Sequence, residues 1–161
     1  MRRFSVFLLV CLSFVCASAQ IRNRLGVGDG LYLKYANGRI RQFDESNILL
    51  ADSTYRYGIQ KSDSRIKMLA LSLELPPRYI RNDTARVKEI VAELKSMSGY
   101  SSIMREFYFL TMHDYCNMLI MSGDITEAML EARGMSSMAA GAGSNLGQMY
   151  AHRVIGLIQS Y

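Results

Sequence analysis

The sequence predicts an all-α protein built from antiparallel helical hairpins. From Asp44 onward, apolar residues recur every three or four positions, which is the spacing of amphipathic helices. The only two prolines of the chain are the adjacent Pro76 and Pro77, so few positions interrupt a helix. We therefore divide the chain into residues 1–19, residues 20–43 and a helical domain over residues 44–161.

The first 19 residues have the order of a secretory signal peptide. Arg2 and Arg3 precede an apolar run from Phe4 to Val15, and the small residues Ala17-Ser18-Ala19 follow. The run is shorter than the roughly 20 residues that span a bilayer, which argues against a membrane anchor. We expect cleavage after Ala19, which leaves 142 of the 161 residues, the size of one domain without a membrane span.

Cysteine usage favours export into a bacterial periplasm. Cleavage removes Cys11 and Cys16 and leaves Cys116 as a single thiol, so the mature chain cannot form an intramolecular disulfide. Exported folds without disulfides are common in bacteria. A lipoprotein with Cys16 as its lipidated residue is disfavoured, because Phe14 and Val15 stand where small residues are needed.

The positive charge is concentrated near the N-terminus. The whole chain has a net charge of +5, but residues 44–161 contain 12 basic and 13 acidic residues. The excess lies in residues 20–43, where five basic residues accompany Asp29 alone. Because the domain itself carries no basic excess, we expect no binding of nucleic acid.

Residues 20–43 form a basic leader that contains several glycines. The motif "GVGDG" lacks the Gly-Lys-Ser/Thr spacing of a phosphate-binding loop. Within residues 31–43, Leu31, Leu33 and Tyr35 alternate up to Asn37-Gly38, a pair typical of tight hairpin turns. A lone hairpin is only marginally stable, so the two interpretations are a small hairpin docked on the helical body and a flexible leader.

Five or six helices are expected after this leader. The second ends before Pro76, because proline disfavours helical geometry in the residue before it. The third is capped by Asp83, and the fifth begins with a capping box made by Asp124 and Glu127. Their approximate ranges are 44–60, 62–75, 84–98, 103–121, 124 to at least 135, and 145–161, with the glycine-rich "AAGAGS" before the last.

The turn Ser122-Gly123-Asp124 joins the most apolar helix to the next one, with small residues on both sides of it. Cys116 lies midway along the first helix and Ala128 early in the second, while Ile155-Gly156 repeats a large-small pair. This pattern resembles the tetratricopeptide repeat family. The chain departs from it at Met112 and Leu119, where aromatic residues are usual, and in a repeat spacing of 40 residues instead of 34.

This resemblance implies a short α-solenoid that binds a protein or peptide and has no catalytic activity or cofactor. An export signal followed by loose repeats also resembles the periplasmic segment of certain bacterial sensor and regulator proteins. The groove of such an array is expected to use Tyr108, Met112, Tyr115 and Tyr150. The last helix, residues 145–161, has no following helix to cover its apolar face, so we expect it to be a surface for self-association.

Two alternatives concern other classes of protein. The stretch "MHDYC" brings His113, Asp114 and Cys116 together, so a small periplasmic metal-binding protein or enzyme is the second hypothesis. A metal site needs three or four converging ligands, and the other histidine, His152, lies in a different expected helix. The third hypothesis is a truncated remnant of a longer regulator.

Overall fold

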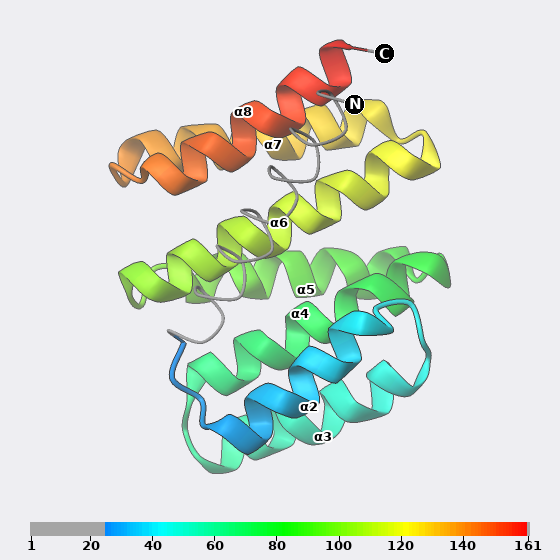
Figure 1. Ribbon diagram of the computed structural model, residues 1–161, viewed down its shortest axis with the longest axis vertical. Coiled ribbons are helices and arrows are strands. Elements are labelled where there is room, and N and C mark those ends of the chain that lie inside the picture. Colours follow the sequence, from blue (N-terminus) through cyan, green and yellow to red (C-terminus); the bar gives the residue numbers. More distant parts are fainter. Residues whose placement is uncertain (1–24, 161) are drawn as a thin grey trace, which may run out of the picture.

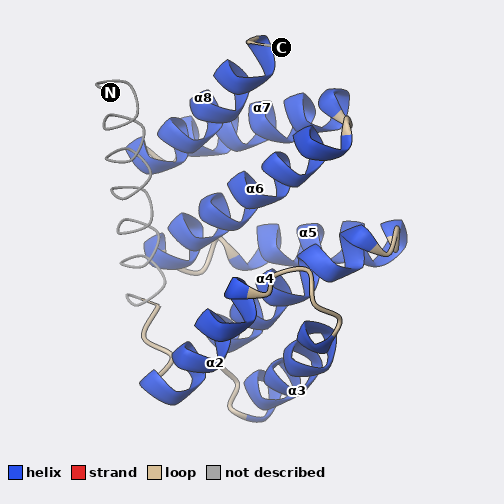
Figure 2. Ribbon diagram, turned by 45° about the vertical axis from the view of Figure 1, so that its right-hand side comes forward, coloured by secondary structure: helices blue, strands red, loops and turns tan. Residues whose placement is uncertain are grey.

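The computed structural model describes residues 25–160, and this part of the chain contains helices and no strands (Figure 2). The prediction of an all-α fold is therefore confirmed. The predicted signal peptide and residues 20–24 lie outside the described residues. The helices are α2 (Asp29–Ile40), α3 (Ser46–Gln60), α4 (Ser64–Ile80), α5 (Thr84–Met97), α6 (Ser102–Ser122), α7 (Ile125–Gly141) and α8 (Asn145–Gln159).

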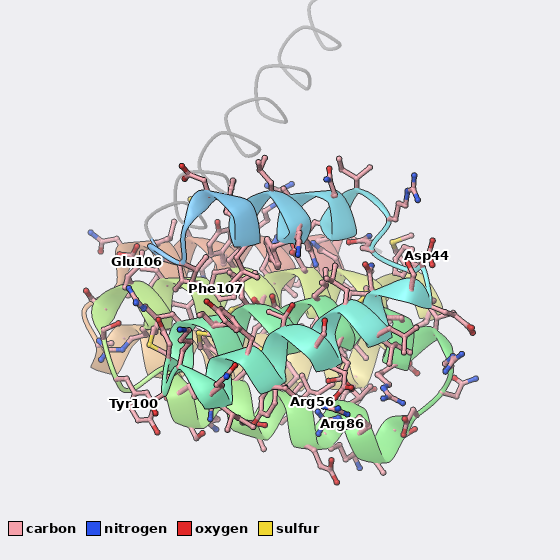
Figure 3. All side chains as sticks on the ribbon, turned by 90° about the horizontal axis from the view of Figure 1, so that it is seen from below. Asp44, Arg56, Arg86, Tyr100, Glu106 and Phe107 are labelled. Atoms are coloured by element: carbon pink, nitrogen blue, oxygen red, sulfur yellow. The ribbon has the colours of Figure 1, made fainter. Side chains whose placement is uncertain are left out.

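The helices are stacked in chain order along the long axis, with α2 and α3 at one end and α8 at the other (Figure 1). From α3 to α8, consecutive helices pack on each other, whereas α2 packs on α4. Helix α6 also contacts α4 and α8, its neighbours but one in the chain. Viewed along this stack, Phe107 of α6 lies inside and Tyr100 lies at the edge (Figure 3). Within residues 25–160, no helix combines the length and apolar character needed to cross a membrane.

The hairpin interpretation of residues 31–43 is wrong, because residues 29–40 form helix α2. Gly38, expected in the turn, is buried in this helix, and a Cβ there would lie 2.7 Å from Leu73 Cδ1. The Asn47 amide donates hydrogen bonds to the carbonyl oxygens of Gly38 (2.9 Å) and Arg41 (2.8 Å). Contacts with α3 and α4 thus override the local turn signal of Asn37-Gly38.

Helix α4 does not end before Pro76, as predicted, but continues to Ile80. Pro76 and Pro77 have no backbone N–H, so they donate no helical hydrogen bond. Both prolines are buried. The buried Glu74 accepts hydrogen bonds from Arg78 Nε (3.0 Å) and, from α5, Arg86 Nη2 (2.9 Å). Apolar burial and these ion pairs offset the loss of hydrogen bonds within the helix.

The ends of the later helices follow the sequence signals in part. The Asp83 carboxylate accepts a hydrogen bond from the Arg86 amide (3.3 Å), which confirms the predicted cap of α5. Gly123 ends α6 with a φ of 89°, a conformation that favours glycine. The prediction of a capping box at the start of α7 is wrong, because the Asp124 side chain makes no capping hydrogen bond. Helix α7 also runs into the "AAGAGS" stretch as far as Gly141.

Helix α8 packs closely on α6 and α7 through a glycine. A Cβ at Gly147 would lie 2.5 Å from Phe109 Cε2 and 2.7 Å from Ala139 Cβ. Gly156, expected to fill this role, is exposed and has no heavy atom within 4 Å of a built Cβ. Val154 is fully buried, so part of the apolar face of α8 is covered by the protein itself. The side chains of Met149 and Leu157 remain 44% and 41% exposed.

Replacement of Gly147 by alanine is predicted to lower the free energy of unfolding by about 1 kcal/mol. The new methyl group overlaps the fully buried Phe109 ring, and overpacking of about 1–3 kcal/mol outweighs the helix-propensity gain of about 1 kcal/mol. Gly134→Ala in α7 is the matched control, because no atom lies within 4 Å of its Cβ position. We expect the control to stabilise the protein by about 0.5–1 kcal/mol. Urea denaturation measures both, and equal stabilisation by the two changes would contradict the close packing.

Candidate binding groove

A groove of about 820 Å³ lies between α5 and α7 and has α6 as its floor. The floor residues Tyr108, Tyr115 and Leu119 are buried and lie along one face of α6. We call this feature the α5–α7 groove. Its lining residues are Tyr79, Ile80, Asn82, Asp83, Thr84, Val87, Lys88, Val91, Ala92, Lys95, Tyr108, Tyr115, Leu119, Ser122, Asp124, Glu127 and Glu131.

The two walls of the α5–α7 groove carry opposite charges. The α5 wall presents Lys88 and Lys95 beside apolar side chains. The opposite wall, on α7, presents Glu127 and Glu131. None of these four side chains forms an ion pair within 4.0 Å inside the described part of the chain. Their charges are therefore available to a ligand.

A hydrogen-bonded cluster closes one end of the groove. The Tyr79 hydroxyl, at the end of α4, donates to Asp124 Oδ2 (2.8 Å) and contacts Ser122 Oγ. The Tyr79 ring packs edge-on against Tyr115, with ring centroids 5.9 Å apart. Asp124, in the α6–α7 turn, thus binds Tyr79 of α4 instead of capping α7. The cluster holds the ends of α4 and α7 around the floor.

Two tyrosine side chains of the floor are buried without hydrogen bonding. Tyr108 is 3% and Tyr115 is 6% exposed, and their hydroxyls make no hydrogen bond among residues 25–160 but are reached by solvent in the groove. Burial raises the pKa of both phenols, and the nearby Glu131 carboxylate raises it further. Both hydroxyls therefore stay protonated at neutral pH and are able to donate or accept a hydrogen bond.

Glu131 is the most perturbed carboxylate of the groove. Burial raises the pKa of Glu131, the neighbouring Glu127 raises it further, and Lys95 across the groove lowers it. Since the first two effects prevail, the surroundings of Glu131 disfavour a negative charge on its carboxyl group. A positive group brought close to Glu131 would relieve that unfavourable electrostatic energy.

The structure separates the four residues that the sequence suggested for a groove. Tyr108 and Tyr115 line the α5–α7 groove, whereas Met112 and Tyr150 are fully buried in the core and do not line it. The Tyr150 ring packs on His113, with centroids 5.0 Å apart.

The charged walls of the groove were not predicted from the sequence. Their only sequence signal is helical spacing, because Lys88 and Lys95 are seven residues apart and Glu127 and Glu131 are four apart.

Two residues of "MHDYC" lie together, since His113 Nδ1 is 3.5 Å from Asp114 Oδ1, but each of the three candidate residues is engaged in other contacts. The Asp114 carboxylate forms an ion pair with Arg39 of α2. His113 packs on Tyr150, and Cys116 is fully buried, so burial raises the pKa of its thiol to about 12. Among residues 25–160, no three His, Cys, Asp or Glu side chains come together in a way that could hold a metal ion.

Comparison with known proteins gives no match for this chain among family models, curated protein sequences or solved structures.

Cys116 is predicted to resist alkylation by iodoacetamide in the folded protein near neutral pH. Its thiol is fully buried, and its raised pKa keeps the thiolate, which is the reactive form, scarce. Mass spectrometry of the peptide that contains Cys116 measures the modification. The same protein in concentrated guanidinium chloride serves as the control and should be modified rapidly. Comparable rates in the two conditions would contradict the burial.

Proposed function

We propose that this chain is an exported, non-catalytic module that binds a segment of a partner protein in the α5–α7 groove. The observation that carries this proposal is the groove itself, with its buried aromatic floor and two charged walls. The α5 wall runs from Thr84 to Lys95, about 16 Å at 1.5 Å per residue. That length suits about five residues of extended chain, or about three turns of a helix.

The packing of the helices supports a helical-hairpin array. In α-solenoids each hairpin contacts the next, and the stacked helices create an extended binding surface. Here α6 contacts α4 and α8 as well as its chain neighbours. The Ser122-Gly123-Asp124 turn and the buried Cys116 and Ala128 agree with the resemblance to tetratricopeptide repeats. A repeat module of this type supplies a binding surface for a partner protein.

The location of the protein is proposed from its N-terminal sequence. Residues 1–19 have the pattern of a cleaved signal peptide, and the lone Cys116 of the processed chain suits a fold that needs no disulfide. We place the module in a bacterial periplasm, where it would serve as a sensor-type or protein-interaction domain. No catalytic role is assigned to His113, Asp114 or Cys116, because packing or an ion pair engages each of them.

Export is predicted to leave Gln20 as the first residue of the mature protein. Expression of the full chain in a bacterium, followed by N-terminal sequencing of the periplasmic fraction, measures the cleavage site. Ala19→Leu provides a matched variant, because signal peptidase requires a small residue before the cut. We expect this variant to accumulate as the uncleaved precursor. Recovery of a chain that starts at Met1 in the cytoplasm would contradict export.

A bulky residue inside the groove is predicted to abolish peptide binding. Ala92 is exposed on the α5 wall, so Ala92→Trp would fill the groove without disturbing the core. The measurement is selection of displayed random nonapeptides against the purified protein, followed by affinity determination for individual peptides with both forms.

Ala140→Trp is the matched control, since Ala140 is also exposed but lies on α7 outside the groove. Selected peptides should bind the control as tightly as the original protein. The proposal fails if no peptide is selected or if every selected peptide binds Ala92→Trp normally.

A further inference from the structure

We infer that the α7 side of the groove is a pocket for a positively charged side chain, a lysine or arginine of the partner polypeptide. The pocket is formed by Tyr108, Tyr115, Glu127 and Glu131. This inference rests on the proposed function, because it specifies the chemistry of the segment that the groove receives. It is supported by two independent observations on these residues.

The first observation is that two floor tyrosines, almost fully buried as residues, present hydroxyls to the groove that no group among residues 25–160 binds. A tyrosine whose ring is buried usually has its hydroxyl hydrogen-bonded, so these two hydroxyls are open to a ligand that enters the groove. Tyr108 and Tyr115 are both more than nine-tenths buried, and both line the groove. Their hydroxyl oxygens are able to accept hydrogen bonds from an ammonium or guanidinium group.

The second observation is the charge on the adjacent wall. Glu127 and Glu131 are separated by one helical turn and face the same groove, and neither has an ion-pair partner in the described residues. Glu131 also lies near enough to both floor tyrosines to affect their protonation. Carboxylates beside tyrosine rings attract cations through charge-assisted hydrogen bonds and through the faces of the rings.

The charge of the opposite wall determines how the partner segment is oriented across the groove. Lys88 and Lys95 of α5 repel a cation and attract an acidic group. A segment with a basic side chain on one face and an acidic side chain on the other would match both walls. A neutral segment would leave the hydroxyls and carboxylates of the pocket without charged partners. We therefore expect charge to determine which segments bind.

The test is titration of the ¹⁵N-labelled protein with the blocked tripeptide N-acetyl-Gly-Arg-Gly-amide. Its citrulline analogue has nearly the same shape without the charge, so it isolates the electrostatic contribution. We expect saturable chemical-shift changes in α5, α6 and α7 with the arginine peptide and binding at least about tenfold weaker with citrulline. Absence of saturable changes in these helices, or equal binding of the two peptides, would overturn the inference.

Two variants test whether the arginine peptide binds in the pocket. Glu131→Gln keeps the shape and removes the charge, and Tyr115→Phe removes one hydroxyl. Each should weaken the arginine peptide, Glu131→Gln by about tenfold. Glu89→Gln on α5 is the matched control, because it makes the same change outside the groove and should leave binding unchanged. Equal affinity in all three variants would place the peptide elsewhere and overturn the inference.

The random nonapeptides distinguish this inference from the proposed function. Nonapeptides that are blocked by Ala92→Trp and contain a required lysine or arginine support both. If peptides blocked by Ala92→Trp contain no basic residue, the cation pocket is wrong while the groove remains a binding site. If Ala92→Trp blocks none of the selected peptides, the proposed function is wrong as well.

Discussion

Helix α6 is enclosed by the rest of the protein, and its burial determines where the other helices lie. Helices α4, α5, α7 and α8 all contact α6, and Arg39 of α2 reaches it through the ion pair with Asp114. Buried residues occur on every side of α6, so it has no single apolar stripe. Its side chains must be covered from several directions at once, and the stack of helices on both sides of α6 provides that cover.

The groove results from the way in which the neighbouring helices pack on α6. Helices α5 and α7 both pack on α6 but make no extensive contact with each other, so the surface of α6 between them is left at the bottom of a depression. Tyr108 and Tyr115 lie there, and their amphipathic side chains suit a site that is apolar at its base and polar at its opening. Charged residues of α5 and α7 then face each other across the opening. The site is therefore assembled from helices that are adjacent in space and separated along the chain.

Glycines allow three pairs of helices in the stack to pack closely. Gly38 allows α2 to approach α4, Gly58 allows α3 to approach Lys67 of α4, and Gly147 allows α8 to approach Phe109. In each case a Cβ would lie within 3.0 Å of another residue. These glycines lie inside helices, where their conformational freedom is a cost of about 0.5–1 kcal/mol, and close packing accounts for their presence.

The sequence by itself determined the helical class of the domain, the position of most helices and the turn at Gly123. These features depend on apolar spacing, helix caps and glycine conformation, which act over a few residues. Only the tertiary structure decided that Asn37-Gly38 lies in a helix and that α4 continues through Pro76 and Pro77, since burial against distant residues outweighed the local preference. It also decided which aromatic residues line the groove. Tyr108, Met112 and Tyr115 all belong to a helix that is buried on every side, so periodicity identifies no face as the binding face.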